Sequence, residues 1–233
     1  ISPYMSEQQL SSISQWNISA LADIDAELSG QHQQLRSATI SGMFHNVTFS
    51  DATGRYVGEN LAAQIQLKLH TEANNWFWQQ TLTLQDGQAY FDPVFLDVAE
   101  QSIMIRSEGQ FNSEDKHWQI NDLWFEQDES VQASGKLQGQ NTQLQNVQLD
   151  LNSSNLAQLY QSWLQPFFPG SSLSRLQTSG QVNANVQWQS EHYKITMDLQ
   201  SVSVADEAER FSIENLDGQL GWTNQSTVLP VAL

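Results

Sequence analysis

VSVADEAERFSIENLDGQLGW, from Val202 to Trp222, has a second copy in this chain, and the fold prediction starts from that duplication. The earlier copy, VTFSDATGRYVGENLAAQIQL, runs from Val47 to Leu67 and aligns with the later one without a gap. Identical residues at matching positions include Asp51 and Asp206, Arg55 and Arg210, and Asn60 and Asn215. A self-match at a fixed offset indicates a repeat architecture. A tandem duplication of a multi-strand unit is therefore predicted.

The segments around both copies alternate between apolar and polar residues, which is typical of strands with one dry face. The first such strand has apolar residues at Trp16, Ile18, Ala20, Ala22, Ile24, Ala26 and Leu28. Trp76, Trp78, Leu82 and Leu84 alternate in the same way and end at Asp86-Gly87, which predicts a hairpin turn. The phase slips by one residue at Ser201, which predicts a bulge.

Two segments have helical spacing instead. Ser6 to Ser14 is predicted as a short helix. A second helix is predicted after Ser154-Asn155, with a polar cap at its start and prolines at its end. Its apolar residues, which share one face, are Leu156, Leu159, Tyr160, Trp163 and Leu164. We expect four of these residues, Leu156, Leu159, Tyr160 and Trp163, to pack on the apolar side of the sheet.

The predicted fold is mostly β. It is a long, curved antiparallel sheet with an open groove, built from tandem repeats, with one or two short helices packed into it. Residues 1–152 form the first repeat unit, and residues 153–233 form a second, truncated unit, within one continuous sheet.

Composition excludes several functional classes. The formal net charge of -17 disfavours nucleic acid as a partner, because phosphate groups are repelled. The chain has no cysteine, so it has neither disulfides nor thiolate metal sites. No apolar run reaches the roughly 18 residues of a membrane helix. A first residue other than Met and the apolar tail from Val228 to Leu233 suggest a fragment of a longer chain.

Catalytic motifs are not found, and we predict no enzymatic activity, no cofactor and no metal site. The five histidines are isolated, and no nucleophile or phosphate-binding motif is present. The acidic groups Asp206-Glu207-Glu209 and Glu126-Asp128-Glu129 are interpreted as solvated loops. Asp51 with Arg55, and Asp206 with Arg210, are expected to form ion pairs that fix a turn.

Tryptophans suggest a further possibility, because aromatic faces stack on sugars. Trp76 and Trp78 share the apolar face of one strand, and this favours the core for both. Trp124 is the exception, since it is out of phase with Leu123 and Phe125.

Several phrases together resemble the AsmA-like superfamily of Gram-negative envelope proteins, which includes TamB-, YhdP- and YdbH-type chains. The phrases are Leu156-Ala157-Gln158-Leu159-Tyr160, Leu164-Gln165-Pro166-Phe167, Thr178-Ser179-Gly180-Gln181-Val182, Glu214-Asn215-Leu216-Asp217-Gly218-Gln219-Leu220 and Gly87-Gln88-Ala89-Tyr90-Phe91-Asp92-Pro93. The resemblance implies a periplasmic β-groove, an inner-membrane anchor in a longer parent protein, and a role in phospholipid transport for outer-membrane homeostasis.

The leading functional expectation is therefore a non-enzymatic periplasmic segment that shields phospholipid acyl chains. Its candidate groove residues are Leu61, Ile65, Leu67, Leu69, Val182, Val186, Trp188, Tyr193, Ile195, Met197 and Leu199. Two alternatives stay open. A carbohydrate-binding β-sandwich predicts coplanar exposed tryptophans, and a structural or adhesion β module predicts a closed dry core.

Overall fold

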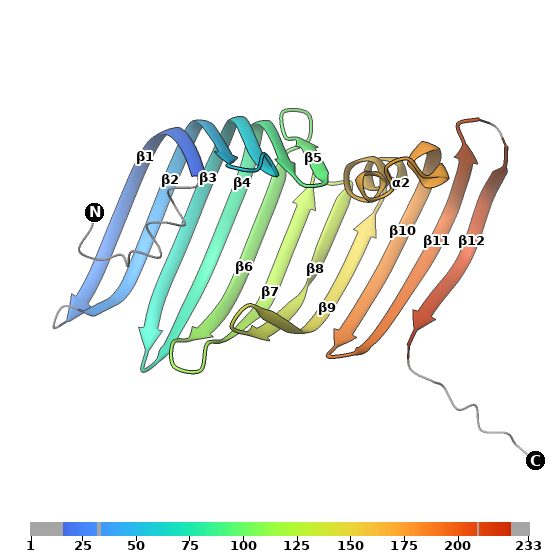
Figure 1. Cartoon of the computed structure of the whole chain (residues 1–233). Coiled ribbons are helices and arrows are strands. Elements are labelled where there is room, and N and C mark those ends of the chain that lie inside the picture. Colours follow the sequence, from blue (N-terminus) through green and yellow to red (C-terminus); the bar gives the residue numbers. More distant parts are fainter. Residues whose placement is uncertain (1–15, 32–33, 209, 225–233) are drawn as a thin grey trace, which may run out of the picture.

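The computed structural model describes residues 16–31, 34–208 and 210–224, and their strands form a single 12-stranded antiparallel sheet (Figure 1). The strands follow one another in sequence order across the sheet, and only β5 leaves this path by pairing with β4 alone. The prediction of a mostly β, open antiparallel sheet with a short packed helix is confirmed.

The strands are long, and most are joined by tight turns. Their bounds are β1 (Trp16–Gln31), β2 (Gln34–Asp51), β3 (Tyr56–Glu72), β4 (Asn75–Phe91), β5 (Val94–Asp97), β6 (Ile103–Asn112), β7 (His117–Gln127), β8 (Val131–Gln140), β9 (Gln143–Ser153), β10 (Leu176–Gln189), β11 (His192–Asp206) and β12 (Ser212–Thr223). The sheet continues from β9 to β10, across the predicted unit boundary at residue 152.

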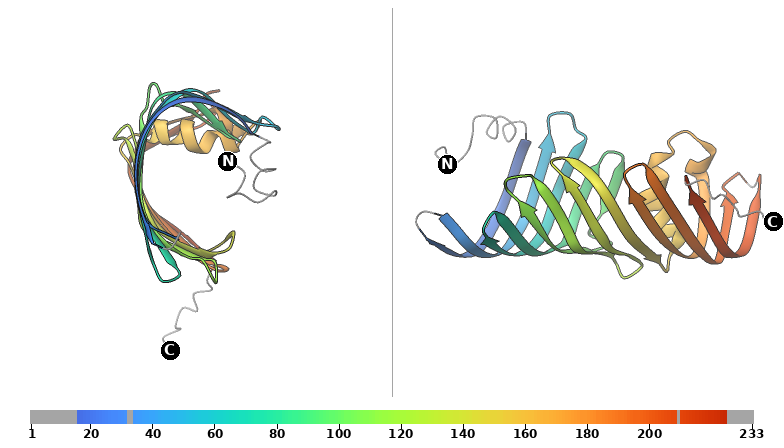
Figure 2. Two further views of the ribbon diagram at one scale, coloured as in Figure 1. Left: turned by 90° about the vertical axis from the view of Figure 1, so that its left-hand side faces the viewer. Right: turned by 90° about the horizontal axis from the view of Figure 1, so that it is seen from below.

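The sheet bends along its strands, so that its cross-section is an open arc (Figure 2, left). The helical segment lies on the concave side of this arc, beneath one rim. It begins as α2 (Leu156–Leu159) and continues as a π-helical turn, η2 (Tyr160–Leu164), and the 3-10 turn η3 (Gln165–Phe167). A separate 3-10 turn, η4 (Ser172–Arg175), leads into β10.

The concave face is largely apolar, because the strand registers align the dry positions of neighbouring strands. One row of directly paired residues, one from each strand except β5, is Ile24, Gly42, Ile65, Leu82, Ile105, Phe125, Ala133, Leu151, Ala184, Met197 and Leu220. The next row is Ala26, Ile40, Leu67, Gln80, Ser107, Leu123, Gly135, Leu149, Val186, Ile195 and Trp222. A one-residue slip at any strand would turn its apolar set to the other face.

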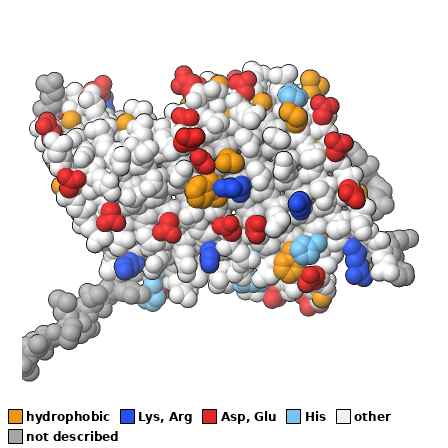
Figure 3. Space-filling model, turned by 180° about the vertical axis from the view of Figure 1, so that it is seen from behind, with side chains coloured by type: hydrophobic (Ala, Val, Ile, Leu, Met, Phe, Trp, Pro, Cys, Tyr) orange, Lys and Arg blue, Asp and Glu red, His pale blue; other side chains and the backbone are white. Residues whose placement is uncertain are grey.

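The convex face is polar. The row that lies between the two apolar rows consists of Asp25, Ser41, Gln66, Thr81, Arg106, Trp124, Ser134, Asp150, Asn185, Thr196 and Gly221. Figure 3 shows many acidic side chains on this face, together with some basic and His side chains and few apolar ones. The sheet therefore has one wet and one dry side, as the alternation predicts.

Two apolar clusters hold the helix against the sheet. The first is centred on Leu61, Ala89, Val94, Leu96, Val98 and Ile103, and the second on Val131, Leu159, Val182, Leu199 and Val202. Trp163 packs against both clusters, and its ring meets Phe125 edge-on at a centroid distance of 5.4 Å. Asn155 caps the helix, because its side-chain oxygen accepts a hydrogen bond from the backbone N–H of Gln158 at 3.2 Å. The predicted helix and its docking face are thus confirmed.

Both copies of the duplicated sequence have the same local structure. Asn60 and Asn215 each have a φ of 53°, in the left-handed region that Asn tolerates better than most residues. The backbone N–H of Asn60 donates to Thr48 Oγ1 at 3.5 Å, and the backbone N–H of Asn215 donates to Ser203 Oγ at 3.1 Å. The register of each strand pair shifts nearby, and the shift between Leu199 and Val202 is the bulge predicted at Ser201.

The prediction of a hairpin at Asp86-Gly87 is wrong. Both residues lie inside β4, where the register against β3 shifts between Glu59 and Ala63. Gly87 has a φ of 87°, and a Cβ there would lie 2.5 Å from the Glu59 carbonyl oxygen. The Asp-Gly pair therefore provides the positive φ of a bulge rather than that of a turn. The helix predicted at Ser6 to Ser14 and the apolar tail lie outside the described residues.

Candidate functional site

The candidate site is the concave face itself. At its two ends the apolar side chains remain largely exposed: Ile24 is 56% exposed and Leu28 63% on β1, and Trp222 is 48% exposed on β12. Toward the middle, the row residues Ile65, Leu82, Ile105, Phe125 and Leu151 are half-buried. Every strand of the described residues belongs to the one sheet, so no second sheet covers this face.

The predicted groove residues all lie on this face, at different depths. Leu61, Val182 and Leu199 are buried in the clusters beneath the helical segment. The half-buried members are Ile65, Leu67, Leu69, Val186, Trp188, Ile195 and Met197. Tyr193 is exposed and pairs directly with Trp188. The three deep residues thus fix the helix, and the others form the open surface.

The sequence analysis missed the central part of the face. The strands β6 to β9 contribute Ile105, Leu123, Phe125, Leu149 and Leu151 to the two apolar rows. Their alternation is visible in the sequence. The register that aligns them with the predicted residues is visible only in the structure.

Several of the polar groups on the dry side of the sheet find partners within the protein. The indole of Trp78 donates to Ser107 Oγ at 3.2 Å. Gln127, which is buried, accepts from the indole of Trp163 at 2.6 Å and donates to Gln101 at 2.7 Å. A buried polar group costs free energy unless it is hydrogen-bonded. These bonds lower the cost of placing polar groups beside apolar ones, and the bond from Trp163 also orients the helix.

Four aromatic rings extend the apolar surface to the rim at the β1 end. Trp16 lies 6.1 Å from Phe49 and 5.9 Å from Tyr56, measured between ring centroids. Phe91 lies 6.1 Å from Phe49 and 6.4 Å from Tyr56. Tyr56 and Phe91 are each about two-fifths exposed. Aromatic rings at these spacings attract one another beyond their area burial, which favours an ordered rim.

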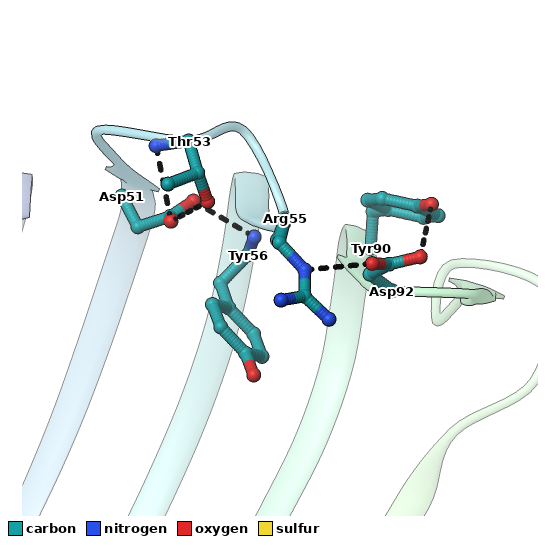
Figure 4. Close-up of polar contacts among 6 residues, drawn as sticks. All are labelled: Asp51, Thr53, Arg55, Tyr56, Tyr90 and Asp92. Carbon is teal, nitrogen blue, oxygen red and sulfur yellow. Dashed lines mark hydrogen bonds and ion pairs between the residues drawn. The ribbon is translucent and has the colours of Figure 1, made fainter.

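Next to these rings, a polar cluster fixes the turn between β2 and β3 (Figure 4). The Asp51 carboxylate accepts from the Thr53 hydroxyl and, at 2.9 Å, from the Tyr56 amide. These bonds, led by the Thr53 hydroxyl, lower the pKa of Asp51 to about 2. The cluster therefore stabilises the turn between β2 and β3.

The predicted ion pair between Asp51 and Arg55 is wrong. Arg55 Nε instead donates to Asp92 Oδ2 at 2.7 Å, across to the end of β4 (Figure 4). The Asp51 carboxylate accepts hydrogen bonds from Thr53 and Tyr56 within the turn, and the Arg55 side chain pairs with Asp92 instead. In the later copy the pairing is as predicted, since Arg210 donates twice to the buried Asp206 carboxylate. These bonds lower the pKa of Asp206.

The described residues hold no group of three or more His, Asp or Glu side chains placed to bind a metal ion. The interpretation of the two acidic groups as solvated loops is wrong for two of their residues. Asp206 is buried, and Glu126 is half-buried in β7, where it accepts from the Trp124 indole at 3.1 Å. Glu209 lies outside the described residues. Across the described part of the chain, no helix has both the length and the apolar character needed to span a bilayer.

Comparison with models of known protein families, with curated proteins and with solved structures gave no match for this chain. This protein is therefore classed by its fold and by the surface that the fold exposes. It is an open, single-layer antiparallel sheet with an exposed apolar face on its concave side.

Proposed function

We propose that this chain is a non-enzymatic segment of an AsmA-like envelope protein whose concave face shields phospholipid acyl chains. The parent protein would be anchored in the inner membrane and would act in the periplasm, in lipid supply to the outer membrane. The observation that carries this proposal is the pair of largely apolar rows that cross the sheet and that no second sheet covers within the described residues.

An exposed apolar surface of this extent favours a hydrophobic ligand. Monomeric soluble proteins rarely expose contiguous apolar patches larger than a few hundred Å². An acyl chain of about 16 carbons has roughly 12 kcal/mol of unfavourable hydration, at about 0.8 kcal/mol per methylene. Contact with Ile24, Leu28 or Trp222 would remove both surfaces from water at once.

The dimensions of the sheet also fit acyl chains. Strands spaced at about 4.8 Å make the path from β1 to β12 roughly 50 Å wide. One leaflet of a bilayer has a hydrocarbon depth of about 15 Å, half of the full core. The concave face could therefore contact several acyl chains placed end to end, which suits a conduit better than a single-ligand pocket.

The competing functions fit the fold less well. A carbohydrate-binding β-sandwich needs two packed sheets, whereas all the strands described here form one. A structural or adhesion module with a closed core would bury the residues of β1 and β12, whose side chains are exposed along both strands.

Native mass spectrometry of the purified chain gives a direct test. We expect phospholipid to co-purify with the wild-type chain. We also expect a photocrosslinker at position 195 to label the lipid. Ile195 suits this purpose because it is half-buried in β11 and pairs directly with Val186 and Trp222 on the apolar face.

A matched pair of variants separates the two faces. Ile195→Asp places a carboxylate on the apolar face and should abolish lipid pick-up, since burial of an unpaired charge costs more than the acyl contacts return. Thr196→Asp is the control, because Thr196 pairs with Asn185 and Gly221 on the convex face and should tolerate the charge. If position 195 crosslinks only within the protein and the two variants bind lipid equally, the proposal is wrong.

A further inference from the structure

Trp124 is a large aromatic side chain on the polar face of the sheet. It lies in β7 between Leu123 and Phe125, which point to the concave side, so the Trp124 side chain lies on the convex side. Its direct partners there are Arg106 on β6 and Ser134 on β8. The ring is only half-buried, although no apolar cluster requires an aromatic residue at this position.

The Trp124 ring lies between two hollows in the convex face. One, of about 320 Å³, is lined by Trp124 and by short polar side chains of β8 to β11, among them Ser134, Asp150, Asn183 and Asn185. The other, of about 330 Å³, is lined by Trp124 and by residues of β3, β4, β6 and β7. Each volume is at the lower end of the range of small-molecule sites.

The two sides of the ring differ. On the β6 side, the guanidinium carbon of Arg106 lies 5.5 Å from the ring centroid, in a cation–π contact. The indole N–H donates to Glu126 Oε2 at 3.1 Å, which fixes the orientation of the ring. Toward β8, the partner is the small Ser134, and the ring borders the first hollow. One side of a fixed aromatic ring thus adjoins an open space.

The first hollow is rich in amide and carboxylate groups on a rigid sheet. The Asn185 amide donates to Asp150 Oδ1 at 2.8 Å, and Gln187 donates to Asn185 at 3.1 Å. Along the neighbouring row, the Gln219 amide donates to Asp198 Oδ1 at 2.9 Å. These bonds orient the side chains, and carboxylate and amide oxygens retain further acceptor capacity for ligand hydroxyls.

We propose that the Trp124 ring and the hollow beside it bind an uncharged saccharide chain on the convex face. The C–H groups of a sugar ring carry partial positive charge and would rest on the electron-rich face of the indole. The hydroxyls would donate to Asp150, Asn183 and Asn185. This site is separate from the acyl-chain surface, because it lies on the opposite side of the sheet.

Charge decides which saccharide fits. Asp150 and Asp198 line the first hollow, where the described residues place no basic side chain, and the whole chain carries a net charge of -17. In the second hollow, Lys68 and Arg106 offset Glu108 and Asp122. An anionic polysaccharide would therefore be repelled from the first hollow. A basic peptide would be attracted by the same charges and could place a cation on the indole. A saccharide offers an apolar ring face for the indole together with several hydroxyl donors for the amide and carboxylate oxygens, so the saccharide is favoured.

Titration of the ¹⁵N-labelled full chain with cellohexaose and with chitohexaose tests the proposal. The Trp124 indole resonance is assigned by its loss in Trp124→Phe. We expect at least one hexasaccharide to shift this resonance and to leave that of Trp188, on the concave face, in place. Trp124→Ala should weaken binding roughly tenfold or more, as for other aromatic anchors, while Trp124→Phe retains an aromatic face and binding.

Trp222→Ala is the matched control, because it removes an exposed tryptophan from the opposite face. It should leave saccharide binding unchanged. If Trp124→Ala does not fold, the shift of the wild-type Trp124 indole still decides the matter. The proposal is overturned if neither hexasaccharide shifts that indole, if Trp222→Ala weakens binding as much as Trp124→Ala, or if only hexalysine binds at this ring.

Discussion

Replacement of Leu159 by Ala tests how the helical segment is held on the sheet. Leu159 is only 6% exposed and belongs to the cluster that contains Val131, Val182 and Leu199. Truncation of a buried Leu removes its transfer free energy and leaves a cavity, at a total cost of about 2–5 kcal/mol. Because the helix is short, tertiary contacts rather than helix propensity provide its stability. We therefore expect Leu159→Ala to destabilise mainly the packing of the helical segment on the sheet.

Urea denaturation, followed by circular dichroism, measures the change in the free energy of unfolding. If the segment opens without the sheet, the same loss appears instead in amide exchange of residues 156–164, which should accelerate roughly 30- to 5,000-fold. Leu164→Ala is the control, since Leu164 is 43% exposed on the same segment and should change stability by no more than about 0.5 kcal/mol. Unchanged stability and unchanged exchange in Leu159→Ala would refute the docking argument.

Two further perturbations concern the turn and the sheet packing. The pKa of Asp51 in the folded state is lowered to about 2, chiefly by the hydrogen bond from the Thr53 hydroxyl. The carboxylate therefore stabilises the fold fully above the unfolded-state pKa near 3.8, and this stabilisation is lost as the pH falls toward 2. Melting temperatures of wild type and Asp51→Asn should therefore differ at about pH 5 and converge near pH 2; a difference independent of pH would contradict this. Gly109→Val should cost about 1–3 kcal/mol in a urea titration, because a Cβ at Gly109 would lie 2.3 Å from both the Trp78 ring and the Gln119 carbonyl oxygen. Gly221→Val is its control, with the nearest atom 3.8 Å away, and equal losses in the two variants would show that these groups do not crowd Gly109.

Local patterns in the sequence were sufficient for the strands and for the helix. The alternation from Trp16 to Leu28 predicted β1, because successive side chains of a strand point to opposite faces. Asn155 and the spacing of Leu156, Leu159 and Trp163 predicted a capped helix with one apolar face. Both signals depend on residues close together in the chain.

The ion-pair partners of the charged side chains were less predictable from the sequence. Asp51 and Arg55 match Asp206 and Arg210 in sequence, yet only the later pair forms an ion pair. Asp92, at the end of β4, lies within reach of Arg55, and no residue near Arg55 in the sequence predicts this contact. Asp86-Gly87 failed for a related reason, since a positive φ serves a bulge as well as a turn.

The sequence by itself determined most of the strands, their dry and wet faces and the helix, because each follows from the identity and spacing of nearby residues. The tertiary structure alone decided that the dry faces align from Ile24 to Leu220 as one concave surface. It also decided that Trp124 lies between two hollows on the opposite side. Register and curvature depend on pairing between distant strands and on side-chain packing across them, and no local pattern contains that information.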